Sequence, residues 1–244
     1  MEFFIVSAFP DMFHGVLGES IIKRARESDK VAVTLFDLRN FSTDKHKTVD
    51  DYPFGGGPGM ILKPEPIFDC VEHIVREFQL QQPRIVLTSA TGRKFDQQYA
   101  NELAAADARP MILICGHYKG VDERVREHLI TEEISIGDYI LTGGELAAMV
   151  IIDAVVRLLP GVIGDFDSAL GDSFQTETLD CPHYTRPREY RGMEVPDVLL
   201  SGNHAKIEAW RRETALQLTM KHRPDLLQKM KNKNNEEKKN DEQN

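Results

Sequence analysis

Two glycine-bearing loops carry the residues best suited to hold a small, flat ligand. The first, at 137–144, follows a β-branched run and has glycine at both ends, with Tyr139, Ile140 and Leu141 between them. Glycine lets the main chain bend sharply and approach a ligand without a Cβ in the way. This composition suits a heterocycle held by main-chain groups better than it suits a phosphate. The alternative is an ordinary strand-to-helix connection, because glycine is common at turns.

The second loop, 116–124, follows the apolar segment 111–115. Its presence favours the ligand-binding interpretation of both loops. Cys115 ends the apolar segment, and we expect it to be a small core residue rather than a nucleophile.

A third glycine-rich segment, 55–59, matches neither common nucleotide motif. It is not followed by Gly-Lys-Ser/Thr, so it is not a P-loop, and it lacks the Gly-x-Gly-x-x-Gly pattern after a strand. Two interpretations remain open: a flexible loop, or main chain that passes close to a ligand.

Composition describes an ordinary globular protein of 244 residues, with 28% charged and 41% hydrophobic residues. The start is too acidic and its apolar run too short for a signal peptide, and Asp153 interrupts the best apolar stretch. Three scattered cysteines have no metal-type or disulfide-type spacing. We therefore expect a cytoplasmic protein without a membrane span or a protein metal site.

The charge is uneven along the chain. A net charge of −9 argues against a nucleic-acid partner, yet 183–223 holds eight Lys/Arg against five Asp/Glu, together with three histidines. Either a mixed solvated surface or a nucleic-acid contact would explain this stretch.

Strand-like and helix-like segments alternate, which predicts an α/β fold with a mostly parallel sheet and helices on both faces. Ligands of such sheets bind beyond the strand carboxyl ends, where loops 88–92, 116–120 and 137–143 would converge. The expected strands are 2–8, 31–38, 84–88, 111–115 and 130–136, and the expected helices are 11–27 (capped by Asp11), 64–78, 96–106, 144–159 and 201–219.

Four regions follow from this pattern. Residues 1–160 form the α/β domain, and 161–175 form an interdomain linker rich in Gly, Asp and Ser. Residues 176–228 form a small helical domain. Residues 229–244 mix Lys, Asn and Glu with a single apolar residue, which predicts a disordered tail.

The chain closely resembles the bacterial tRNA (guanine-N1)-methyltransferases, members of the trefoil-knotted (SPOUT) methyltransferase superfamily. The similarity runs from about residue 1 to residue 228, with the motifs in the family's order and near its spacing. The six matching motifs are Thr48–Met60, Cys115–Arg124, Ile134–Glu145, Val156–Val162, Asp180–Pro187 and Leu199–Ala205.

The resemblance implies a deep trefoil knot within 84–143, a tRNA-binding role for 176–228, and a homodimer. It implies transfer of a methyl group from S-adenosylmethionine to N1 of the guanosine immediately 3′ of the tRNA anticodon. In the family each active site takes its donor pocket from one subunit and its Asp-bearing linker from the other.

The resemblance also assigns the donor-binding residues. They are Leu87, Ser89, Gly116, Ile136, Gly137, Asp138, Tyr139, Ile140, Leu141, Gly143 and Gly144. Three departures from the family pattern leave individual donor contacts open. Lys119 stands where relatives usually carry an acidic residue, Ala147 replaces a usual proline, and Thr88–Thr91 replaces a usual Leu-Ser-Pro-Gln.

Two catalytic residues follow from the same resemblance. Asp172 takes the position of the general base that removes the proton of guanine N1, whereas the residues alone favour a helix N-cap. Arg157 would stabilise negative charge at guanine O6, although a cation near a helix end can also serve the helix dipole. Asp180 lies near the same site in the family.

The remaining expectations concern RNA and metal. His46, Lys47 and the basic C-terminal stretch are expected near tRNA phosphates. Family members depend on Mg²⁺, and we hypothesise that the ion acts through the RNA or the donor carboxylate. Two rival functions are a related knotted enzyme acting on another base or on a ribose 2′-OH, and a non-catalytic RNA-binding protein.

Overall fold

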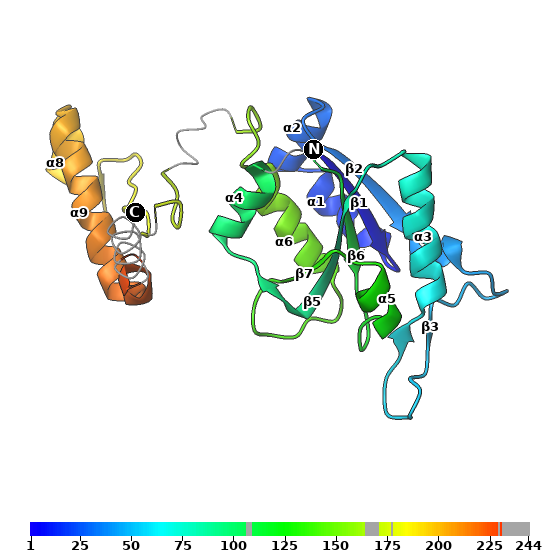
Figure 1. Ribbon diagram of the computed structural model, residues 1–244. Helices are drawn as coiled ribbons and strands as arrows, with labels where there is room; N and C mark the ends of the chain where they lie inside the picture. Colours follow the sequence, from blue (N-terminus) through cyan, green and yellow to red (C-terminus); the bar gives the residue numbers. More distant parts are fainter. Residues whose placement is uncertain (106–108, 164–170, 177, 229, 231–244) are drawn as a thin grey trace, which may run out of the picture. The chain divides into compact units, whose positions relative to one another are not determined.

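The computed structural model describes residues 1–105, 109–163, 171–176, 178–228 and 230. Its contacts divide the chain into two units, Met1–Phe166 and Asp167–Asn244, each of which is described by itself (Figure 1). The predicted disordered tail, apart from Met230, lies outside the described residues. No helix in the described part of the chain combines the length and apolar character that a membrane span requires.

The first unit is built on a parallel sheet with the strand order β2-β1-β6-β5-β7. Alternate residues of the central strands enter two separate cores, with Phe3 on one face and Phe4 on the other. Burial on both faces explains why these strands read as continuous apolar runs. The strands are β1 (Glu2–Ser7), β2 (Ala32–Asp37), β5 (Arg84–Lys94), β6 (Met111–Cys115) and β7 (Glu132–Ser135).

Helices cover both faces of this sheet, which confirms the predicted α/β architecture (Figure 1). One core contains residues of α1 (His14–Leu17), α2 (Ser20–Glu27), α4 (Gln97–Ala105) and α6 (Glu145–Val156), together with the 3-10 turn η1 (Pro10–Phe13). The other contains residues of α3 (Pro64–Glu77), α5 (Glu123–His128) and the 3-10 turn η2 (Leu38–Phe41).

Two expected elements differ from the structure. The single helix expected at 11–27 is broken, because Gly18 and Glu19 separate α1 from α2, and Ser20, the first residue of α2, adopts a positive φ of 54°. Asp11 caps no helix; its carboxylate lies 3.2 Å from His14 Nε2. Strand β5 continues beyond the expected end at Thr88, with a register shift against β7 between Thr88 and Arg93. The expected loop 88–92 is therefore the irregular middle of a long strand.

Three segments distant in sequence meet at the carboxyl ends of these strands. The N–H of Gly144 donates to the carbonyl of Gly116 at 2.7 Å, and His117 pairs with Gly143 in an isolated bridge. A Cβ at Gly144 would overlap Thr88 Oγ1 and would lie 3.0 Å from the Cα of Cys115. Glycine at 144 is therefore needed for the three segments to pack this closely.

Two short hairpins add to this frame and were not expected from the sequence. In the first unit, β3 (Asp50–Asp51) pairs with β4 (Ile61–Leu62), and the glycine-rich segment 55–59 connects them. In the second unit, β8 (Glu189–Tyr190) pairs with β9 (Met193–Glu194).

The second unit is otherwise helical, with α8 (Asp197–Leu200) and α9 (His204–His222). Asn203 caps α9 by accepting from the N–H of Lys206 at 3.1 Å. The expected apolar stripe is half-buried and consists of Ile207, Trp210, Ala215 and Leu218. Thr219 is buried, and its hydroxyl accepts from the N–H of Leu179 at 2.9 Å, which ties α9 to the segment that precedes it.

Candidate active site

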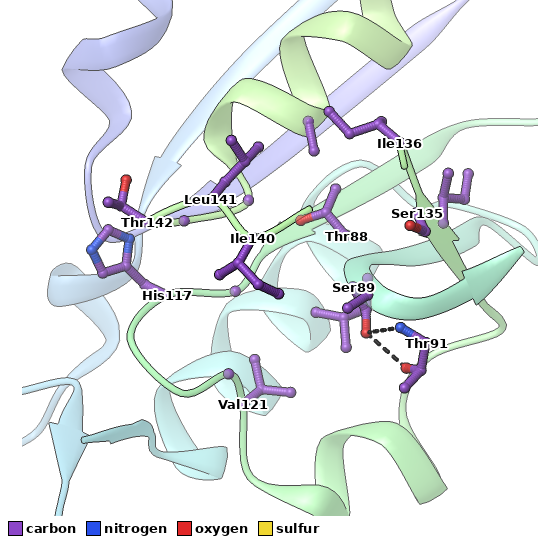
Figure 2. A pocket seen from close by; sticks show the side chains of 18 of the residues that line it. Thr88, Ser89, Thr91, His117, Val121, Ser135, Ile136, Ile140, Leu141 and Thr142 are labelled. Carbon is purple, nitrogen blue, oxygen red and sulfur yellow. Dashed lines mark hydrogen bonds between the residues drawn. The ribbon is translucent and has the colours of Figure 1, made fainter. Parts of the chain in front are cut away.

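A pocket opens at the carboxyl ends of β5, β6 and β7, where parallel α/β sheets bind ligands (Figure 2). Three segments line it: 87–91 of β5, the 116–121 loop and the 134–144 loop. The lining includes ten of the predicted donor-binding residues, namely Leu87, Ser89, Gly116, Ile136, Gly137, Tyr139, Ile140, Leu141, Gly143 and Gly144.

Asp138 is the predicted donor-binding residue whose side chain does not join this lining. Its carboxylate is 92% exposed and lies 3.6 Å from Lys94 Nζ. The family resemblance assigned it to the donor site together with its neighbours on both sides. Its contact with a donor stays a prediction.

The lining combines apolar and polar groups. Leu87, Ile136, Leu141 and Ala147 present aliphatic groups, while glycine main chain and the hydroxyls of 88–91 supply polar atoms. Such a mixture fits the adenosine and the charged ends of S-adenosylmethionine, because ligand pockets combine apolar walls with a few placed polar groups.

Arg126 joins the pocket through an ion-pair network that the sequence did not reveal. It bonds Glu133, and its second nitrogen donates to Ser89 Oγ at 3.1 Å. Thr91 donates to the same carboxylate at 2.6 Å. Burial raises the pKa of Glu133, but the hydrogen bonds from Thr91, Ser89 and Arg126 outweigh it, so the pKa is lowered overall. The charged carboxylate of Glu133 thus fixes segment 88–91, whose residues differ from the usual family pattern.

The glycine-rich segment of the first unit also reaches this pocket loop. Lys119 N–H donates to the carbonyl of Met60 at 3.0 Å, and a Cβ at Gly59 would lie 2.9 Å from Lys119 Cγ. The main chain at 59–60 therefore passes directly beside the 116–121 loop. A close approach of this segment to a ligand stays a prediction.

Arg157 lies at the end of α6, outside the residues that line the pocket. Its N–H donates to the carbonyl of Asp153 at 3.2 Å, and it is half-buried. This is the helix-terminal position at which a cation interacts favourably with the helix dipole. A role toward the acceptor base stays a prediction.

Asp172 belongs to the second unit and does not begin a helix. Its carbonyl accepts from the N–H of Gln175 at 3.3 Å, and residues 173–176 form turns and bends. Ser173 Oγ accepts from the N–H of Asp180 at 2.9 Å, which fixes the segment around it. The helix-capping alternative for Asp172 therefore has no helix to cap, whereas its role as a base stays a prediction.

Asp180, Cys181 and His183 bring three potential metal ligands within 4.8 Å of one another. His183 Nε2 lies 2.7 Å from Asp180 Oδ2. Burial raises the pKa of Asp180. Its hydrogen bonds with His183 and with the N–H of Cys181 lower the pKa by more, so the pKa is lowered overall. Mg²⁺ prefers an octahedron of oxygen ligands, and only the carboxylate meets that preference. This cluster does not fit Mg²⁺.

The fold and pocket together define an α/β protein with a glycine-lined pocket at the strand carboxyl ends and a helical second unit. The family model for tRNA (Guanine-1)-methyltransferase TrmD matches residues 1–229. The chain belongs to this tRNA (guanine-1)-methyltransferase family.

Individual relatives agree with the family match. The tRNA (guanine-N(1)-)-methyltransferase of Listeria innocua is 56% identical over 227 residues, covering 93% of this chain and 92% of the relative. That of Anoxybacillus flavithermus is also 56% identical, over 228 residues and the same shares of both chains. The crystal structure of tRNA (m1G37) methyltransferase from Aquifex aeolicus, 42% identical, gives a TM-score of 0.75 over 94% of this chain and 95% of that one.

Changing Gly137 to valine is expected to weaken donor binding while the first unit stays folded. Gly137 has a φ of +150°, and a Cβ there would lie 2.5 Å from Tyr139 Cε1, so the aromatic ring must move. Calorimetric titration with S-adenosylmethionine tests this, with Gly192→Val as the control. Gly192 also has a positive φ, of +77°, but it lies outside the pocket lining and a Cβ there meets nothing within 4 Å, so donor affinity should stay unchanged. Equal donor affinity in wild type and Gly137→Val would remove the 137–144 loop from the donor site.

Proposed function

We propose that this chain transfers the methyl group of S-adenosylmethionine to N1 of the guanosine immediately 3′ of the tRNA anticodon. The observation that carries the proposal is the combination of the family match over 1–229 with the glycine-lined pocket. The donor lies in that pocket against Leu87, Ile136 and Leu141.

Methyl transfer of this kind is a direct displacement and needs no covalent enzyme intermediate. Cys115 lies beneath the pocket loop but is fully buried, and burial raises the pKa of its thiol well above the usual value. A neutral buried thiol is a poor nucleophile. The protein's tasks are therefore to align donor and acceptor and to remove the acceptor's proton.

Asp172 performs the proton removal in this proposal, and Arg157 stabilises the charge that develops on guanine O6. Guanine N1 is a poor nucleophile until its proton leaves, and a carboxylate is a suitable general base. A guanidinium remains charged and offers a planar pair of donors, so lysine would replace Arg157 poorly.

A homodimer is part of the proposal, and α6 offers a surface for it. Leu146 and Val150 lie one turn apart on this helix and are each 47% exposed, while the pocket residue Ile140 is 85% exposed. Exposed aliphatic side chains on an otherwise buried helix suit an interface with a second copy of the chain.

The dimer proposal predicts that Leu146→Asp with Val150→Asp converts the dimer to a monomer. Two carboxylates in an apolar interface would lose hydration without a partner. Sedimentation of wild type and variant measures the change, with Leu216→Asp on α9 as control because Leu216 is 45% exposed. A monomeric wild type, or a double variant that remains dimeric, would contradict this interface.

The tRNA is the macromolecular partner, and the cytoplasm, where tRNA is modified, is the proposed location. His46 and Lys47 are exposed and lie near one another in the first unit, while Arg186, Arg188 and Arg191 are exposed in the second. Phosphate contacts from these side chains would position the RNA. We propose that any Mg²⁺ requirement acts through the RNA or the donor carboxylate.

The test of the proposed function is nucleoside analysis after reaction. The purified chain is incubated with unmodified tRNA and methyl-labelled donor, the RNA is digested, and the labelled nucleoside is identified. Label in N1-methylguanosine supports the proposal. Label in a 2′-O-methyl nucleoside or another base would support the related knotted enzymes, and tRNA binding without any transfer would support a non-catalytic protein.

A further inference from the structure

A buried carboxylate lies directly behind the wall of the donor pocket. Glu145, the first residue of α6, is 1% exposed, and its Oε1 accepts from the hydroxyl of Ser7 at 2.7 Å. Ser7, at the end of β1, is itself fully buried and also accepts from the N–H of Phe9. An ionised carboxylate is costly to bury unless partners compensate it, so the remaining oxygen of Glu145 requires a donor.

His117 is the side chain that faces this second oxygen. Its Nδ1 lies 3.6 Å from Glu145 Oε2, and it is buried without a hydrogen-bond partner among the described residues. Two acceptors held face to face in a buried site would repel each other. We therefore place a proton on Nδ1, directed at the carboxylate, where a small movement of the ring completes a charge-assisted hydrogen bond.

The main chain at Gly143 passes close to both members of this pair. A Cβ at Gly143 would overlap both Glu145 Oε2 and His117 Nδ1, which explains the glycine at this position. The imidazole also packs on Phe9, with ring centroids 4.5 Å apart. Figure 2 shows His117 on the loop that lines the pocket, beside the 140–142 segment.

We propose that Glu145 and His117 are positioning residues for the methyl donor. Glu145, held by Ser7, fixes the imidazole through Nδ1–H, and His117 thereby fixes the main chain of Gly116 and the following loop against the 140–144 segment. The inference rests on the proposed function, because it takes the donor to occupy this pocket. Glu145 and His117 would together keep the pocket loop rigid.

Two substitutions of His117 separate a hydrogen-bonding role from simple packing. His117→Phe keeps an aromatic ring against Phe9 but removes the donor, whereas His117→Asn loses the ring but places an amide N–H near the position of Nδ1. We expect His117→Phe to weaken S-adenosylmethionine binding by about 10-fold to 100-fold, the usual effect of losing a hydrogen bond to a charged group. His117→Asn should bind the donor more tightly than His117→Phe.

Glu145→Gln provides an independent variant at the other end of the pair. It should weaken donor binding in the same range, and the double variant with His117→Phe should lose less than the product of the two single losses. The matched control is the pair His128 and Glu127, whose atoms are also 3.6 Å apart but whose side chains are exposed. His128→Phe and Glu127→Gln should leave donor affinity unchanged.

The measurement is calorimetric titration with S-adenosylmethionine, together with KM values for donor and tRNA and a melting curve for each variant. The expected result is a raised Kd and a raised donor KM with an unchanged tRNA KM. Donor affinity like wild type in His117→Phe, or tighter binding by His117→Phe than by His117→Asn, would overturn the inference. Failure of wild type itself to bind the donor would instead reject the proposed function.

Discussion

Replacing Asp172 by asparagine is expected to lower the single-turnover rate of methyl transfer by roughly 10²–10⁴-fold, the usual effect of removing a general base. Donor binding should be unchanged, because Asp172 belongs to the second unit and the pocket is built from the first. Asparagine keeps the size of aspartate, and residues 173–176 contain no helix for either side chain to cap. The substitution therefore removes the base with little structural change.

Single-turnover rates measured across pH make this test sharper. The two pH profiles should differ, because without the carboxylate the Asp172→Asn rate should follow the guanine's own ionisation. Asp197→Asn, an exposed aspartate of the same unit, is the control. Near-normal turnover by Asp172→Asn would exclude Asp172 as the base.

Gly144→Ala is expected to cost the first unit about 3 kcal/mol of unfolding free energy, the upper part of the usual range for overpacking. The new methyl group would overlap Thr88 Oγ1 and lie 3.0 Å from main-chain atoms of Cys115 and Gly116. These atoms belong to packed strands and cannot move cheaply. The melting temperature should fall by roughly 10 °C, and donor binding should be lost with the geometry of the strand ends.

The control for this substitution is Gly15→Ala. A Cβ at Gly15 meets nothing within 4 Å, the residue lies in α1, and alanine is favoured over glycine in helices by about 1 kcal/mol. Thermal denaturation of the two variants separates crowding from a general effect of removing glycine. A Gly144→Ala protein that melts with wild type would contradict the packing described for the three segments.

The sheet could be predicted from the sequence because its strands are buried on both faces. Runs such as Met111–Cys115 are apolar without alternation, which is typical of a short strand buried on both faces. The continuation of β5 through 89–94 could not be predicted, because these residues are polar and include Gly92. A Cβ at Gly92 would overlap the main chain at Glu133 and Ile134, so this glycine serves a close strand contact rather than a turn.

The pocket loops could also be predicted, because two glycine-bearing loops follow apolar strands, and the carboxyl ends of parallel strands meet at one edge of the sheet. The charged residues that support these loops could not be predicted from the sequence. Arg126 lies in the last turn of a short helix, Glu133 within a strand and Glu145 at a helix start, and only the tertiary structure brings them to the pocket. The catalytic assignments of Asp172 and Arg157 came from the family resemblance, since an isolated carboxylate and a helix-terminal arginine have common structural explanations.

Methyl transfer to two tRNA transcripts that differ at one nucleotide tests the central claim most directly. One transcript carries guanosine immediately 3′ of the anticodon, and the other carries adenosine there. With methyl-labelled S-adenosylmethionine and the purified chain, we predict incorporation approaching one methyl group per molecule of the first transcript and none in the second. Equal labelling of both transcripts, or labelling of neither, would contradict the account.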